Sequence, residues 1–132
     1  MHYAISFESK QFDLDNEEEN PINPIKGKSV GAWMTNLLKN EDIKVTEVDA
    51  EDWGCYIYAT YQGNKYLVGF IGIPAESKDD APEIIIQVDK SRSFIESILG
   101  KNKMTKSDPL LSIVQGHINS LSDAAKIEVM IA

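Results

Sequence analysis

The sequence contains a single cysteine, Cys55, so the chain cannot form an internal disulfide framework. Cys55 stands between Gly54 and Tyr56 in an apolar stretch, and no histidine or basic residue close to it would lower the pKa of the thiol. We therefore expect a small buried core residue and not a reactive nucleophile.

Long apolar runs are also missing, and none approaches the roughly 20 residues that a membrane-spanning helix needs. The first residues, MHYAISFESKQFD, lack the basic start and apolar stretch of a signal peptide. We therefore expect a cytoplasmic protein with no membrane partner.

Histidine is scarce, and the motifs of common enzymes are absent. His2 lies beside the start of the chain and His117 on the apolar side of a predicted helix, so histidine-based catalysis is not expected. The chain has no hydrolase elbow, phosphate-binding loop, zinc pair or dinucleotide fingerprint. Asp13, Asp15 and Glu17 alternate as in cation-binding loops, but the glycine and the distant glutamate of such loops are missing. We expect no metal and no cofactor, and a non-enzymatic role is favoured.

Positive charge is in deficit, with 13 basic against 21 acidic residues and a net charge of −8. Residues 1–53 hold 5 lysines and 12 acids, a net −7, whereas residues 54–132 hold 8 basic residues and 9 acids, a net −1. Acidity of this degree disfavours a nucleic-acid partner, because neutralisation of phosphates supplies most of that affinity. It is compatible with a basic protein partner, or with a role in solubility alone.

The stretch 53–73 predicts a β-hairpin with a two-residue turn at Gly63-Asn64, since both residues tolerate positive φ. This turn predicts the facing pairs Tyr61–Tyr66, Ala59–Val68, Ile57–Phe70 and Cys55–Gly72. Alternation then gives one apolar face with Trp53, Cys55, Ile57, Ala59, Val68 and Phe70. The opposite face carries Tyr56, Tyr58, Thr60, Leu67 and Ile71.

Hydrophobic periodicity predicts the other elements. Apolar residues at helical spacing, with Trp33 in the stripe, predict a helix over 29–40 that covers the Ile57 face of the hairpin, with Ser29 as its N-cap. Further helices are predicted over 94–99 and from Pro109 onward. Strands are predicted over 2–8, 43–48, 83–89 and 125–131. The order β-α-β-β-β-β-α-α-β predicts a single α+β domain over 1–132, with an antiparallel sheet of 5–6 strands packed with three helices.

A long irregular acidic loop is predicted at about 9–28. Its consecutive glutamates and two prolines oppose regular structure, yet it contains four large apolar residues: Phe12, Leu14, Ile22 and Ile25. We expect a loop attached to the body at intervals, and loops of this length are often functional. A plain surface crossover is the alternative.

The candidate binding residues are acidic side chains and two strand tyrosines. Tyr56 and Tyr58 would form an exposed platform if the helices cover only the other face, and tyrosine is a common interface anchor. Burial of this face by the two C-terminal helices is the alternative, and the one that the sequence favours. The candidate partner-binding residues are Glu17, Glu18, Glu19, Glu51, Asp52, Tyr56 and Tyr58.

Four segments carry a resemblance: NPINPI, EDWG before an aromatic strand, QVDKSRS, and KNKMTKSDP. In these, over nearly its whole length, the chain resembles small uncharacterised bacterial proteins. The resemblance implies no activity, ligand or site residue.

The leading hypothesis is a non-enzymatic acidic protein-binding domain, such as an immunity or inhibitor protein for a basic toxin or enzyme. A small-molecule-binding or enzymatic domain with a pocket between sheet and helices is the alternative. A homodimer formed through strand edges or the Tyr56/Tyr58 face is a third possibility.

Overall fold

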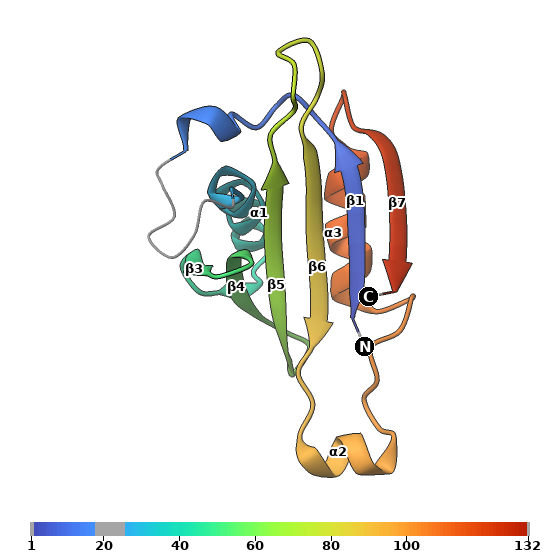
Figure 1. The fold of residues 1–132 in the computed structure, drawn as a ribbon. Coiled ribbons are helices and arrows are strands. Elements are labelled where there is room, and N and C mark those ends of the chain that lie inside the picture. Colours follow the sequence, from blue (N-terminus) through green and yellow to red (C-terminus); the bar gives the residue numbers. More distant parts are fainter. Residues whose placement is uncertain (1, 18–25, 132) are drawn as a thin grey trace.

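The structure, a computed structural model, describes residues 2–17 and 26–131 and has the α+β architecture that the sequence predicts (Figure 1). Its strands are β1 (Tyr3–Glu8), β2 (Lys44–Val45), β3 (Asp49–Glu51), β4 (Gly54–Tyr61), β5 (Asn64–Ile73), β6 (Glu83–Lys90) and β7 (Ala125–Ile131). Its helices are the short 3₁₀ turn η1 (Leu14–Asn16), α1 (Lys28–Asn40), α2 (Phe94–Leu99) and α3 (Pro109–Asn119).

The described strands form one antiparallel sheet in the order β2-β4-β5-β6-β1-β7, and β3 also pairs with β4. The N-terminal strand β1 lies between β6 and β7, so the two terminal strands pair with each other and extend the sheet. The two ends of the chain therefore lie close together at one side of the sheet (Figure 1).

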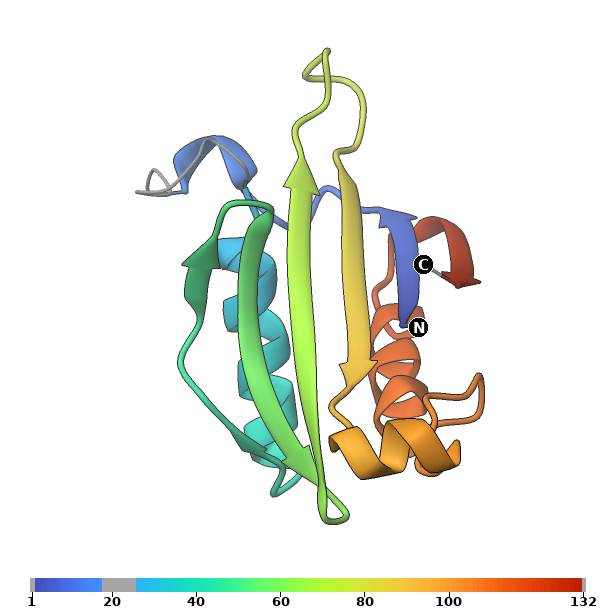
Figure 2. The same ribbon diagram turned by 60° about the horizontal axis from the view of Figure 1, so that its bottom comes forward.

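Both long helices lie on the same face of the sheet. In Figures 1 and 2, α1 lies behind β4 and β5 and α3 lies behind β1. Side chains from both helices share one core with the strands, among them Met34, Leu38, Leu111, Ile57 and Phe70. The expectation that the 29–40 helix covers the Ile57 face is thus confirmed. The expectation that the C-terminal helices cover the Tyr56/Tyr58 face is wrong.

The hairpin turn lies one residue earlier than predicted. Gln62 and Gly63 are the turn residues, with φ of 51° and 78°, and Tyr61 pairs with Asn64. Ile57 consequently faces Val68, not Phe70, and Cys55 faces Phe70. A tertiary contact accompanies the shift, since the amide of Asn102 donates to Oδ1 of Asn64 at 2.7 Å. The shift moves every pair by two residues, so the two faces keep their strand residues.

The segment predicted as one strand over 43–48 forms β2 and, after a gap, leads into β3. Residues 49–51, for which the sequence predicted no strand, form β3, and Asp49 pairs with Tyr56. Between β2 and β3 the hydroxyl of Thr46 accepts from the N–H of Tyr58 at 2.9 Å, and this contact replaces a regular strand ladder there.

The long loop is attached to the body through its apolar residues. The ring of Phe12 meets the ring of Trp33 edge-on at 5.2 Å, and Leu14 is buried against Gly72. A side chain at Gly72 would approach Leu14 Cδ2 to 2.8 Å, so the glycine permits this contact. Ile22 and Ile25 lie outside the described residues.

Candidate functional site

The face of the sheet opposite α1 and α3 is uncovered in the part of the chain that the structure describes, and we call it the open face. It is the face toward the viewer in Figure 1. Paired residues of antiparallel strands point to the same side, so the register assigns Tyr56, Tyr58, Leu67, Ile71 and Ile85 to it. These five side chains lie outside the buried core and remain partly or largely accessible. A sheet with apolar residues on an uncovered face is typical of a docking surface.

Trp53 belongs to the open face, not to the core face where the sequence placed it. It precedes β4 in a turn, and its ring lies directly over Gly69, where a β-carbon would come within 2.7 Å of the indole. The strand alternation does not extend to Trp53, because the turn frees its side chain to fold back over the sheet. Gly69 is therefore required for close packing of an aromatic ring.

Three aromatic rings form a row on the open face. Trp53 and Tyr56 are 6.3 Å apart between ring centroids, and Tyr56 and Tyr58 meet edge-on at 5.5 Å. The ammonium of Lys65 lies 4.3 Å from the Tyr58 ring, in cation–π range. Tyr58 is 37% exposed. Aromatic side chains fixed against one another lose little conformational entropy on binding, which suits an interface anchor.

The open face carries more carboxylates than cations. Strand residues that share this face comprise six acids and three lysines, a net −3: Glu8, Asp49, Glu51, Glu83, Asp89 and Glu128 against Lys44, Lys65 and Lys126. Asp49 faces Tyr56, and desolvation together with this carboxylate raises the pKa of the Tyr56 hydroxyl. Asp52 is exposed in the turn beside Trp53. Of the predicted candidates, Glu51, Asp52, Tyr56 and Tyr58 therefore gather at one face.

Glu17 does not belong to this surface. Its carboxylate accepts from the N–H groups of Gly27, Lys28 and Ser29 at 2.9, 3.1 and 3.0 Å, and also from the Ser29 hydroxyl. These are the unpaired donors at the start of α1, so Glu17 takes the capping role predicted for Ser29. The assignment of Glu17 to partner binding disagrees with this use of its carboxylate. Glu18 and Glu19 lie outside the described residues.

Replacing Glu17 by alanine should lower the free energy of unfolding by about 2 kcal/mol, the upper end for a lost helix cap, because several charge-assisted bonds disappear together. Glu17→Gln keeps acceptor atoms and should lose less. Urea unfolding compares both variants with Glu47→Ala, an exposed glutamate outside the helices. A Glu17→Ala variant as stable as Glu47→Ala would show that the cap contributes nothing.

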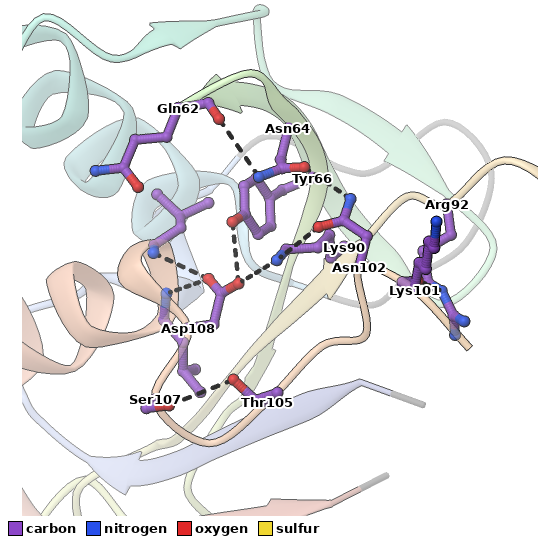
Figure 3. Close-up of polar contacts among 12 residues, drawn as sticks. Gln62, Asn64, Tyr66, Lys90, Arg92, Lys101, Asn102, Thr105, Ser107 and Asp108 are labelled. Atoms are coloured by element: carbon purple, nitrogen blue, oxygen red, sulfur yellow. Dashed lines mark hydrogen bonds and ion pairs between the residues drawn. The ribbon is translucent and has the colours of Figure 1, made fainter. Parts of the chain in front are cut away.

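A buried polar cluster fastens the start of α3 to the end of the β4–β5 hairpin (Figure 3). Oδ2 of Asp108 accepts from the Tyr66 hydroxyl and pairs with the Lys90 ammonium, both at 3.0 Å. Oδ1 of Asp108 caps α3 by accepting from the N–H groups of Leu110 and Leu111. Burial, followed by the bond to Asp108, raises the pKa of the Tyr66 hydroxyl well above its usual range. Every charge of this cluster is paired, which is typical of a structural element.

Three clefts in the described part of the chain could in principle take a small molecule. One, of about 400 Å³, lies between the loop after β1 and the β5–β6 connection, and includes Lys10, Asp13 and Asp80. A second, of about 350 Å³, lies beside α2 and contains Lys90, Arg92 and Lys103. The third, of about 340 Å³, lies at the start of α1. None of the three lies between the sheet and the two covering helices, where the alternative hypothesis expects a pocket.

Cys55 and His117, which also carry reactive side chains, occupy structural positions. Cys55 is buried, as expected, and desolvation raises the pKa of its thiol. Nε2 of His117 faces the carboxylate of Glu41, across the contact of α3 with the end of α1. Within residues 2–17 and 26–131, no group of three or more histidine, cysteine or acidic side chains could hold a metal ion.

Sequence reasoning missed two features of the site. The only sequence signal for the position of Trp53 over Gly69 was the glycine itself, which lies mid-strand opposite Tyr56. Such a glycine indicates close packing but does not show which residue packs there. The exposure of α2 was not foreseen at all, because a short apolar stripe is usually buried.

Comparison with known proteins adds no relative: no protein-family model, no curated protein and no solved structure matches the chain significantly. No helix in the described residues is long and apolar enough to cross a membrane.

Proposed function

We propose that the chain is a non-enzymatic protein-binding domain that uses its open face to cover a basic surface of another protein, in the manner of an immunity or inhibitor protein. The observation that carries the proposal is the row of Trp53, Tyr56 and Tyr58 on a sheet face that no helix of the described chain covers. A cytoplasmic location belongs to the same proposal, since a lone buried thiol such as Cys55 suits a reducing compartment.

The chemistry of the open face supports one class of partner. Fixed aromatic rings supply apolar contact area along β4, near one edge of the sheet, and the carboxylates of the same face favour a partner with lysine or arginine at its rim. The chain carries a net charge of −8, which would speed encounter with such a partner at low ionic strength. Affinity would then depend on the aromatic row, and association rate on the carboxylates.

The pocket alternative has less support. An enzyme of this size would be expected to pair carboxylates in a cleft and raise the pKa of one of them. The carboxyl groups whose pKa values are shifted, Glu96 and Asp123, are instead shifted downward, chiefly by backbone N–H groups that donate to them. Glu96 caps the start of α2, and Asp123 holds the loop after β1 in place.

A pull-down from the native host tests the proposal with a matched pair of charge reversals. Asp49→Lys with Asp52→Lys changes the margin of the aromatic row, and Asp79→Lys with Asp80→Lys makes the same charge change in the exposed β5–β6 connection. We expect a basic protein to be retained by the unchanged chain and by the Asp79/Asp80 variant. The Asp49/Asp52 variant should retain it at least tenfold less, given the size of coupling between close interface charges.

Thermal unfolding of the same variants separates loss of binding from loss of structure, because all four side chains are exposed. If the two variants retain the same proteins to the same extent, the open face is not the binding surface. Equal recovery of a basic protein by both variants would therefore contradict the proposal.

A further inference from the structure

Helix α2 carries four of the five most exposed large apolar side chains of the described chain. Phe94, Ile95, Ile98 and Leu99 are 78%, 67%, 66% and 59% exposed, and no residue of α2 is buried. They occupy one side of the helix, at spacings of one and four residues. Single exposed apolar residues are common, but four in one contiguous stripe indicate an interaction site.

The helix is held in a fixed conformation although nothing in the described chain covers the stripe. Ser93 and Glu96 form a reciprocal capping box, with bonds of 2.9 and 3.1 Å, and Gly100 ends the helix in the left-handed region at φ 66°. The guanidinium of Arg92 donates to the carbonyl oxygens of Glu96 and Lys101 at 3.1 and 3.0 Å. The apolar side chains of the stripe are therefore held on a fixed helix before anything binds to them.

Positive charge flanks the stripe. Lys101, Lys103 and Lys106 are exposed directly after α2 and Arg92 precedes it, against the single acid Glu96 within the segment 91–106. This local excess of +3 stands in a chain of net charge −8. The neighbouring Lys90 is not available for a partner, because it is paired with Asp108 inside the protein.

The helix lies at one extremity of the molecule. Figures 1 and 2 show α2 beyond the end of the sheet, at the opposite end from the β5–β6 connection. An apolar tip with cations at its base can enter the boundary between lipid headgroups and acyl chains while the lysines remain at the charged surface.

We propose that α2 docks the protein on an anionic lipid surface. Two observations favour lipid over another protein: the helix lies at one extremity of the molecule, and the positive charge beside the stripe is opposite to that of an acidic bilayer. The acidic residues of the rest of the chain oppose docking only weakly, since their repulsion is screened beyond about 8 Å at physiological salt.

This contact requires no membrane-spanning helix, and the described chain contains none. It departs from the sequence-based expectation of no membrane partner. It is also independent of the open face, which lies on the sheet, so either proposal can fail while the other holds.

Vesicle co-sedimentation tests the docking with two lipid compositions: equal parts of phosphatidylglycerol and phosphatidylcholine, and phosphatidylcholine alone. We expect binding to the mixed vesicles that weakens at high salt, and at least tenfold weaker binding to phosphatidylcholine. Ile98→Asp should weaken binding to the mixed vesicles at least tenfold by removing a buried apolar side chain. Ile73→Asp is the matched control, an isoleucine 47% exposed at the opposite end of the sheet, and should bind like the unchanged protein.

Charge is tested by Lys101→Glu, which should weaken binding by more than about fivefold, the value for loss of one lysine at a charged surface. Lys78→Glu, in the β5–β6 connection, makes the same change away from α2 and should bind like the unchanged protein. Absence of binding to the mixed vesicles, or equal losses for Ile98→Asp and Ile73→Asp, would overturn the proposal. So would a concentration-dependent molar mass that Ile98→Asp abolishes in a protein that ignores vesicles, since α2 would then bind a second copy.

Discussion

Replacing Asp108 by alanine should lower the free energy of unfolding by about 3–5 kcal/mol, the largest effect that we expect from one polar side chain. The substitution leaves the Lys90 ammonium without its carboxylate and the Tyr66 hydroxyl without its acceptor. It also removes the cap of α3. Breaking one partner of a buried ion pair is costly because the remaining charge keeps its desolvation penalty.

Variants that remove fewer interactions separate the contributions to this loss of stability. Asp108→Asn keeps an oxygen that can cap α3 but loses the charge, so it should fall between the unchanged protein and Asp108→Ala. Tyr66→Phe removes one hydrogen bond and should cost about 1 kcal/mol. Ser93→Ala removes the exposed cap of α2, whose apolar side chains touch no core residue, and should change global stability by less than about 0.5 kcal/mol. If urea unfolding gives Asp108→Ala a free energy of unfolding within about 1 kcal/mol of that of the unchanged protein, the cluster has no structural role. This limit corresponds to the contribution of one hydrogen bond.

Replacing Trp33 by alanine should cost about 3 kcal/mol, at the lower end for a large aromatic residue because its ring is only partly buried. Trp33 joins α1 to the long loop through its edge-on contact with Phe12, so its loss should also loosen the segment around Phe12. Asn36→Ala, on the exposed side of α1, is the control and should change stability by less than about 0.5 kcal/mol.

A double-mutant cycle with Phe12→Ala isolates this contact. We expect a coupling energy of about 0.5–1.5 kcal/mol, the range for aromatic pairs. A coupling energy near zero would mean that the loop is held by other contacts and that the Phe12–Trp33 pair is incidental.

Local sequence signals predicted most of the fold. Alternation placed β1, β6 and β7, and the Asp108-Pro109 pair marked the start of α3, because these signals depend only on neighbouring residues. The hairpin turn was missed by one residue because Gln62 adopts a positive φ, which glutamine adopts less readily than asparagine. Its true position coincides with the contact of Asn64 with Asn102, 38 residues further along the chain.

The candidate site was less predictable, because it depends on where helices pack. The sequence predicted that α1 covers the Ile57 face, but the apolar stripe of α3 does not show which face of the sheet that helix selects. Once both select the Ile57 face, Tyr56 and Tyr58 are left uncovered. Likewise the sequence predicts that Glu17 is a surface acid. Only the fold of the loop brings its carboxylate to the start of α1, 10–12 residues further along the chain.

Site-specific photo-crosslinking in the native host tests the central claim most directly, because it identifies the face that meets a partner. A benzophenone amino acid would replace Tyr58 on the open face or, in a second variant, Asn36 on the exposed side of α1. We expect a discrete crosslinked adduct with a basic protein from position 58 and none from position 36. An adduct from position 36 alone would contradict this claim.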